Sequence, residues 1–172
     1  YFIAGQGSAG TNDGPATSAR FKNPHGIAVA PSGDMFVGDR EGHSIRKVLA
    51  SGWTTTIAGT NAAGATDAVG VFAEFSSPYS LHLDANGFLF IGEHSGELRL
   101  LDTSNGLVST LSTAFTQPLA VTSNAAGTSL YVCDFAVGKV FAYGVALPVV
   151  TPNGATPTAL PAVSWTVGQA AL

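Results

Sequence analysis

The sequence carries very little charge and offers no basic surface. Only 10% of its 172 residues are charged, whereas about 25% is typical of soluble domains. The net charge is −4, and the seven Lys and Arg residues are scattered along the chain. A surface that follows nucleic-acid phosphates needs clustered cations, so we predict no nucleic-acid partner.

Cysteine and long apolar runs are also scarce. Cys133 is the single cysteine, which excludes an intrachain disulfide, and its place in the apolar run Leu130–Asp134 predicts a small buried side chain. No apolar stretch approaches the roughly 18 residues of a membrane span, and no apolar signal core follows a basic start. We therefore expect no membrane span. Because the sequence begins at Tyr1 rather than Met, we expect a processed or partial product.

Turn-forming residues are abundant, with 21 Gly and nine Pro, as a chain with many tight turns requires. The short runs between them are rich in Val, Ile, Leu, Phe and Tyr, which predicts strands. These strands come in a repeated order. First strands are expected at Gly26–Ala30, Ser80–Asp84 and Leu119–Ser123; second strands at Met35–Asp39, Phe88–His94 and Leu130–Phe135; third strands at Ser44–Leu49, Glu97–Asp102 and Lys139–Gly144; fourth strands at Trp53–Gly59 and Leu107–Thr113.

The repeat begins three times with Phe and Pro three residues apart, at Phe21, Phe75 and Phe115. Phe21 and Phe75 lie 54 residues apart, and Asp13 and Asp67 share this separation, whereas Phe75 and Phe115 are only 40 apart. The third copy therefore lacks a long Gly- and Ala-rich connection before it. A repeated series of four short strands predicts an all-β fold, a partial β-propeller of four-stranded antiparallel blades.

The spacing also predicts the organisation of the chain. Ile3-Ala-Gly5 matches Ile57-Ala-Gly59 at the same 54-residue separation, so the N-terminal residues are expected to end a preceding repeat. The propeller segment is predicted over residues 1–146, divided into the end of a preceding blade (1–18), two blades (19–72 and 73–113) and a partial blade (114–146); residues 147–172 are predicted to be a Pro/Thr-rich linker or the start of a further β element.

Residues 1–145 resemble the NHL repeat of β-propellers. The resemblance rests on Pro24-His-Gly-Ile-Ala-Val29, Pro31-Ser-Gly33, Val37-Gly-Asp39, His43-Ser-Ile-Arg-Lys47 and Thr56-Ile-Ala-Gly59, and it weakens in the second and third copies. It implies a ring of four-stranded blades around a central channel. Members of this family include protein-binding scaffolds, RNA-binding domains, metal-dependent lyases and surface proteins, so the resemblance alone does not select an activity.

Three blades and part of another cannot close a ring of about four to eight. Either the chain continues beyond this piece, or two copies join head to tail, with each Tyr1–Gly5 strand completing the other copy's last blade. The partner expected at the open edges, Tyr1–Gly5 and Leu147–Pro152, is therefore protein: the rest of the chain itself, a second copy or another subunit.

A carboxylate and a cation recur at the turn between second and third strands. The pairs are Asp39 with Arg46, Glu93 with Arg99, and Asp134 with Lys139. A substrate site would not need copying in every blade, so we predict a charge-assisted brace rather than a catalytic site.

Histidines raise the question of a metal, because lyases of the resembled family hold zinc through histidines near the channel. His25, Tyr79 and His82 are predicted contacts at the channel mouth, but no third histidine completes a ligand set. No serine elbow, phosphate loop or paired-cysteine motif is present either. We predict no metal, no cofactor and no catalytic residue.

The tail combines Thr with Pro, and Thr151, Thr156 and Thr158 are candidate O-glycosylation sites, although a plain spacer explains the pattern as well. Together with the few lysines, this tail favours an extracellular or cell-surface protein. The sequence predicts a non-catalytic propeller scaffold or protein-interaction module within a larger secreted or surface assembly. The alternative is a fragment of a propeller-type lyase or hydrolase with a metal site on the channel axis.

Overall fold

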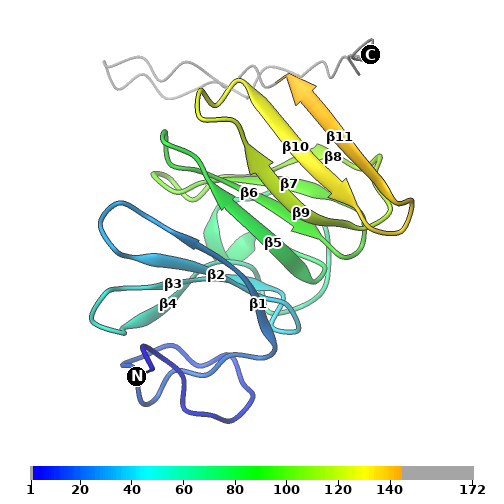
Figure 1. The fold of residues 1–172 in the computed structure, drawn as a ribbon. Helices are drawn as coiled ribbons and strands as arrows, with labels where there is room; N and C mark the ends of the chain where they lie inside the picture. The colour runs from blue at the N-terminus through cyan, green and yellow to red at the C-terminus, as the bar shows by residue number, and fades with distance from the viewer. Residues whose placement is uncertain (1, 145–172) are drawn as a thin grey trace.

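The computed structural model describes residues 2–144, which form three antiparallel sheets arranged side by side (Figure 1). Within each sheet the strands follow one another in chain order, and we call the sheets blades 1, 2 and 3. This arrangement confirms the prediction of an all-β, partial-propeller fold. Blade 1 contains β1 (Pro24–Val29), β2 (Met35–Asp39), β3 (Ser44–Val48) and β4 (Thr54–Ala58); blade 2 contains β5 (Pro78–Leu83), β6 (Phe88–Glu93), β7 (Leu98–Asp102) and β8 (Val108–Ser112); blade 3 contains β9 (Pro118–Ser123), β10 (Ser129–Asp134) and β11 (Lys139–Gly144).

Each first strand begins at a proline and starts with an irregular register. The shifts lie beside Pro24, Pro78 and Pro118, where the strand needs no backbone donor. β1, β5 and β9 lie next to one another and form the inner edge shared by the three sheets (Figure 1). Gly92 of β6 permits this close approach, because a Cβ atom there would collide with the carbonyl oxygen of Pro118.

Every blade has two faces that pack in a fixed order. We call the face that carries Ala28, Phe36 and Ile45 in blade 1 the forward face, and the opposite face, with Ile27 and Val37, the rear face. The forward face of one blade packs on the rear face of the next. Between blades 1 and 2 the buried cluster contains Phe36, Ile45, Leu89, Ile91 and Leu101; between blades 2 and 3 it contains Phe90, Leu98, Leu100, Val121, Leu130 and Val132.

These two apolar layers hold the sheets together. Full burial of each large aliphatic or aromatic side chain contributes about 1.5–3 kcal/mol. The layers also explain why the prediction of a buried Cys133 is wrong. Cys133 is exposed because it lies on the forward face of blade 3, on which no other blade packs within residues 2–144.

Residues 2–23 do not form the strand that was expected at Tyr1–Gly5. Within this segment the structure has one isolated bridge, between Gly14 and Thr54. The N–H of Gly5 donates to the carbonyl oxygen of Ala16 at 2.8 Å. It is therefore not available to pair with a strand of a second copy. The prediction of a Tyr1–Gly5 strand is therefore wrong for the part that is described, residues 2–5.

The segment instead repeats the connection that precedes blade 2. The bond from Gly59 N to Gly70 O, at 3.2 Å, matches the one from Gly5 to Ala16. The second connection also contains a short 3-10 helix, η1 (Gly70–Phe72). No helix in the described part of the chain has the length or apolar character needed to cross a membrane. The domain limits remain a prediction, and Leu147–Pro152 and the tail threonines lie outside the described residues.

Candidate functional site

Arg46 is fully buried and forms the centre of a polar network in blade 1. Its Nη1 donates to Asp39 Oδ2 at 3.3 Å and to the carbonyl of Arg20 at 2.8 Å. Its Nη2 donates to Asp13 Oδ1 at 2.7 Å and to the carbonyl of Asn12 at 3.0 Å. The guanidinium thus joins the blade to the segment that precedes it in the sequence.

Arg99 makes the same set of contacts in blade 2. It donates to Glu93 Oε1 at 2.9 Å, to Asp67 Oδ1 at 2.7 Å, and to the carbonyls of Glu74 and Thr66 at 2.9 and 3.2 Å. The structure therefore brings together two of the three predicted pairs. It also adds Asp13 and Asp67, whose 54-residue separation was visible in the sequence but whose contact with an arginine was not predicted.

Both arginines also lie over a phenylalanine ring. The Cζ atom of Arg46 is 5.1 Å from the ring centroid of Phe21, and that of Arg99 is 5.3 Å from Phe75. Such cation–π contacts add about 0.5–2 kcal/mol, depending on burial. Phe21 and Phe75 are the residues with which the repeat begins, so the network fixes the start of each of these two blades.

Burial raises the pKa of both acids that pair with the arginines, Asp39 and Glu93. It raises the pKa of Glu93 to about 7, although the N–H of Ser76 and the Arg99 guanidinium act in the opposite direction. Burial also raises the pKa of Asp39, opposed by the N–H of Lys22 and by Arg46. Perturbed acids can mark catalytic sites, but these two are fully buried and are hydrogen-bonded to arginine and backbone.

Blade 3 does not contain the predicted pair. Asp134 accepts bonds from the N–H groups of Thr116 and Gln117, at 2.7 and 3.0 Å. Within the described residues it forms no ion pair with Lys139, which is exposed. The register shows why: Arg46 lies opposite Val37, and the residue opposite the equivalent Val132 is Phe141. The choice of Lys139 as a brace residue was therefore wrong.

A second cluster lies at the end of the blades where the first strands begin. The ring of Tyr79 lies 3.5 Å from that of His25 and 6.4 Å from that of His94, centroid to centroid. The Cζ atom of Arg40 is 5.8 Å from the Tyr79 centroid, and Gln117 Nε2 is 3.3 Å from His94 Nε2. We call these five residues, which come from all three blades and the turns beside them, the rim.

The rim contains two of the three predicted channel-mouth residues. His82 lies apart from it, on β5, with its Nε2 2.8 Å from Ser123 Oγ and its ring 6.3 Å from that of Phe90. Burial lowers the pKa of His82, which agrees with its place between blades 2 and 3. The rim residues Arg40, His94 and Gln117 were not predicted.

The backbone beside the rim is strained. Asn23, Ser77 and His43 have φ angles of 65°, 64° and 50°, a region that Asn and His accept more readily than most residues but that Ser rarely occupies. The N–H of Ser77 donates to His43 Nδ1 at 3.2 Å. Burial lowers the pKa of His43, which favours the neutral ring that such an acceptor requires. Strained residues tend to gather at functional sites.

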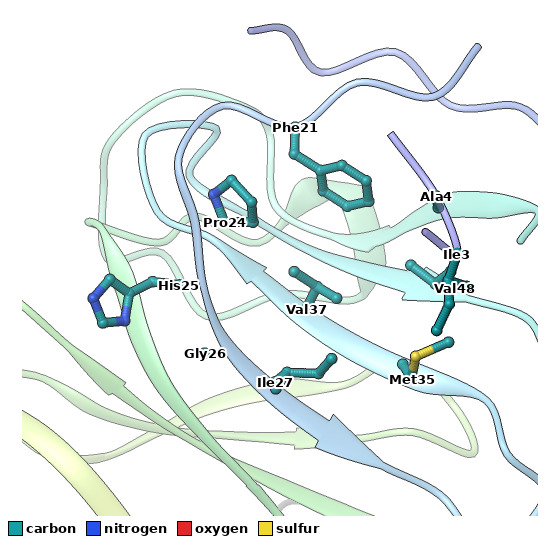
Figure 2. Close-up of a pocket in the computed structure, with 10 residues that line it drawn as sticks. All are labelled: Ile3, Ala4, Phe21, Pro24, His25, Gly26, Ile27, Met35, Val37 and Val48. Carbon is teal, nitrogen blue, oxygen red and sulfur yellow. The ribbon is translucent and has the colours of Figure 1, made fainter. Parts of the chain in front are cut away.

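No group of three or more His, Cys, Asp or Glu side chains within residues 2–144 is placed to hold a metal ion. A hollow near these residues is instead mostly apolar. A pocket of about 410 Å³ opens on the rear face of blade 1. Figure 2 shows Val37, Met35 and Ile27 on one side of it and Phe21 with Ile3 on the other, while His25 points away.

Comparison with known proteins agrees with the repeated blades. The model of the NHL repeat matches residues 21–48, which cover β1, β2 and β3. Residues 21–48 therefore carry an NHL repeat, and the described residues have the fold of a partial β-propeller. This propeller is 31% identical over 108 residues to Protein SUPPRESSOR OF QUENCHING 1, chloroplastic, of Arabidopsis thaliana; the match covers 62% of the chain but 10% of that protein.

Solved structures share the propeller's fold at low sequence identity. They are a protein of unknown function from Bacteroides thetaiotaomicron (19% identity, TM-score 0.58), hydrazine synthase from Kuenenia stuttgartiensis (18%, 0.56) and an auxiliary nutrient binding protein from Bacteroides ovatus (17%, 0.61). The matches cover 68%, 81% and 73% of this chain and 33%, 36% and 38% of those chains. The propeller thus spans about a third of each structure, and these likenesses concern fold alone.

Proposed function

We propose that this NHL-repeat propeller is a non-catalytic protein-interaction module and that its partner binds at the rim. The propeller fold supports an interaction or scaffold role in general. The observation that carries the rim proposal is the convergence of five polar and aromatic side chains from three blades beside a strained backbone. We further propose a secreted or cell-surface setting, supported by the low charge and the Pro/Thr-rich tail.

Arg40 indicates the chemistry of the partner. Arg46 and Arg99 are each paired with two carboxylates and two backbone carbonyls, whereas Arg40 forms no ion pair among the described residues. A guanidinium held beside an aromatic ring binds a carboxylate and packs a flat or apolar group at once. The proposed partner therefore presents an acidic side chain next to an apolar or aromatic one.

The test is photo-crosslinking from a photoreactive residue placed at position 25, followed by binding measurements with the purified crosslinked protein. Arg40→Gln and Tyr79→Ala are each expected to weaken binding about tenfold or more, as central aromatic and Arg contacts do. Lys47→Gln is the matched control, because Lys47 lies outside the rim and pairs with Asp34 at 3.1 Å. If both rim variants fold and bind as the wild type does, the proposal is wrong.

A further inference from the structure

An apolar patch lies on the outer side of the sheets, on η1 and the residue before it. Val69, Val71 and Phe72 are 53%, 50% and 76% exposed, and we call these three residues the η1 patch. η1 contacts β4, and Val69 forms a bridge with Leu107, directly before β8. β4 and β8 are the outermost strands of blades 1 and 2. The patch therefore belongs to a connection between two described blades, and not to the free face of blade 1 or blade 3.

The fold does not require apolar residues at these positions. The connection before blade 1 contains the same turn, 54 residues earlier. The N–H of Ser18 donates to the carbonyl of Pro15 at 2.8 Å, and the N–H of Phe72 donates to that of Val69 at 3.2 Å. The exposed residues that match in position are polar in the first turn and apolar in the second: Thr17 and Ser18 against Val71 and Phe72. Since the turn forms with polar residues, the exposed apolar ones favour a contact surface.

The charge beside the patch also differs between the two connections. Arg20 in the first occupies the position of Glu74 in the second. Glu74 is partly exposed, accepts a bond from Thr66 Oγ1 at 2.6 Å and forms no ion pair within residues 2–144. The sequence from residue 48 to residue 98 contains no Lys or Arg. The η1 patch is therefore bordered by negative charge, which attracts a cationic partner and repels an anionic lipid surface.

We propose that the η1 patch binds a basic amphipathic segment of another protein. The apolar side of the segment covers Val71 and Phe72, and one of its Lys or Arg side chains pairs with Glu74. Docking of an amphipathic helix by its apolar side is a recurring mode of peptide recognition. This site is separate from the rim, because the rim offers a cation to an acidic partner and the η1 patch offers a carboxylate to a basic one. The chain thereby holds two partners of opposite charge.

Two designed peptides test the proposal on the full chain. Both have about 18 residues, enough to form a helix, with leucine at helical spacing. One carries lysine at its remaining positions and the other carries glutamate. Fluorescence anisotropy is expected to show binding of the lysine peptide alone. Val71→Thr/Phe72→Ser, which copies the residues of the first turn and so preserves the fold, is expected to weaken binding about tenfold. Glu74→Gln is expected to weaken it about threefold and to reduce its dependence on salt.

A matched control and a map of the contact complete the test. Phe135→Ser is the control, since Phe135 is 74% exposed but lies between β10 and β11, and it should bind as the wild type does. Amide NMR shifts caused by the lysine peptide are expected within residues 65–74. Absence of binding, equal binding by Val71→Thr/Phe72→Ser, or shifts confined to other residues would overturn the proposal.

Lipid vesicles and the rim variant separate this site from its alternatives. Binding of the wild type, but not of Val71→Thr/Phe72→Ser, to phosphatidylglycerol or phosphatidylcholine vesicles would assign the patch to a lipid surface and overturn the proposal; no such binding is expected. Arg40→Gln is expected to bind the lysine peptide as the wild type does, so this result and the rim proposal stand or fall separately.

Discussion

Blades 1 and 2 differ from blade 3 at the position of the third strand that lies opposite Val37, Ile91 and Val132. Arg46 and Arg99 fill it with a buried guanidinium, whereas blade 3 has Phe141. The phenylalanine at the start of each blade also makes a different contact in blade 3. Phe21 and Phe75 accept a cation, but the equivalent Phe115 makes an edge contact with Phe141 at 5.5 Å.

The connections before the blades explain this difference. A long connection precedes blades 1 and 2 and supplies an aspartate and two backbone carbonyls to the arginine. Blade 3 follows directly after β8, from Ser112 to Pro118, so no long connection supplies an aspartate and carbonyls to a guanidinium there. The arginine therefore attaches the long connection to its blade. In blade 3, which lacks that connection, the apolar ring of Phe141 occupies the arginine's position.

The largest effect is expected for removal of the cation in blade 2. Arg99→Met leaves Glu93 buried without its partner, and breaking a buried ion pair in this way costs about 3–5 kcal/mol. Urea unfolding monitored by circular dichroism measures this loss. In the double variant Arg99→Met/Glu93→Leu, we expect most of the lost stability to be restored, because no charged group is then left buried without a partner. A loss below about 1 kcal/mol in the single variant would contradict the role assigned to the arginine.

The pH dependence of stability is expected to have opposite signs in blades 2 and 3. The pKa of Glu93 is raised to about 7 in the fold from a usual value of 4.5. Its contribution is complete below pH 4.5 and is lost as the pH rises through 7, by about 3 kcal/mol in total. Unfolding of wild type and Glu93→Gln at pH 5 and pH 8 measures it: the wild type should lose stability relative to the variant.

Asp134 is expected to behave in the reverse manner. Burial alone would raise its pKa, but backbone N–H donors, those of Thr116 and Gln117 first among them, hold the pKa below 3.8. Its contribution is therefore present above pH 3.8 and is lost as the pH falls further. Compared with Asp134→Asn, the wild type should lose stability below pH 4. If Glu93 and Asp134 showed the same sign, the distinction between the blades would fail.

An arginine in blade 3 tests whether the connection is the cause. Phe141→Arg introduces the cation of blades 1 and 2 without the aspartate and carbonyls that receive it, and it removes the contact with Phe115. We expect a loss of about 1–3 kcal/mol, measured by thermal unfolding. Phe141→Leu, which removes the aromatic contact but keeps an apolar side chain, is the control and should cost less.

The smallest effect is expected at the exposed end of the network. The Asp67 side chain is 47% exposed, so screening by solvent limits the effect of Asp67→Asn to about 1 kcal/mol. The effect should be local, because Asp67 also accepts bonds from Thr110 N and Oγ1. Faster hydrogen exchange at the amides of Thr110 and Glu74, with β9–β11 unchanged, would show it; uniform acceleration would speak against a local role.

The sequence predicted the strands well because Gly, Pro and alternating apolar residues are local signals. It also paired Asp39 with Arg46 correctly, since one turn separates them. The prediction of Lys139 failed because the number of residues between the acid and the cation decreases from copy to copy. Counting from Asp134 leads to Lys139, whereas the register places Phe141 opposite Val132. The contact of Asp67 with Arg99 spans 32 residues and has no local signal.

The rim was missed for a related reason, although a signal existed. Arg40 and His94 each follow the acid of the network directly, as residue 40 after Asp39 and residue 94 after Glu93. Both residues are partly buried, and the turn that holds the acid also places them at the end of the blades. Gln117 has no such signal, because its place beside His94 depends on how blades 2 and 3 pack.

The hydrogen bonds that recur every 54 residues, from Gly5 to Ala16 and from Gly59 to Gly70, have a consequence for engineering this scaffold. Because each long connection is tied to the blade that follows it, the natural cassette runs from one such glycine to the end of the next fourth strand. When a whole blade is inserted or deleted, the junction should therefore be placed at Gly59 rather than beside Phe75. A cut at Phe75 would separate Asp67 from Arg99 and leave the buried charge behind.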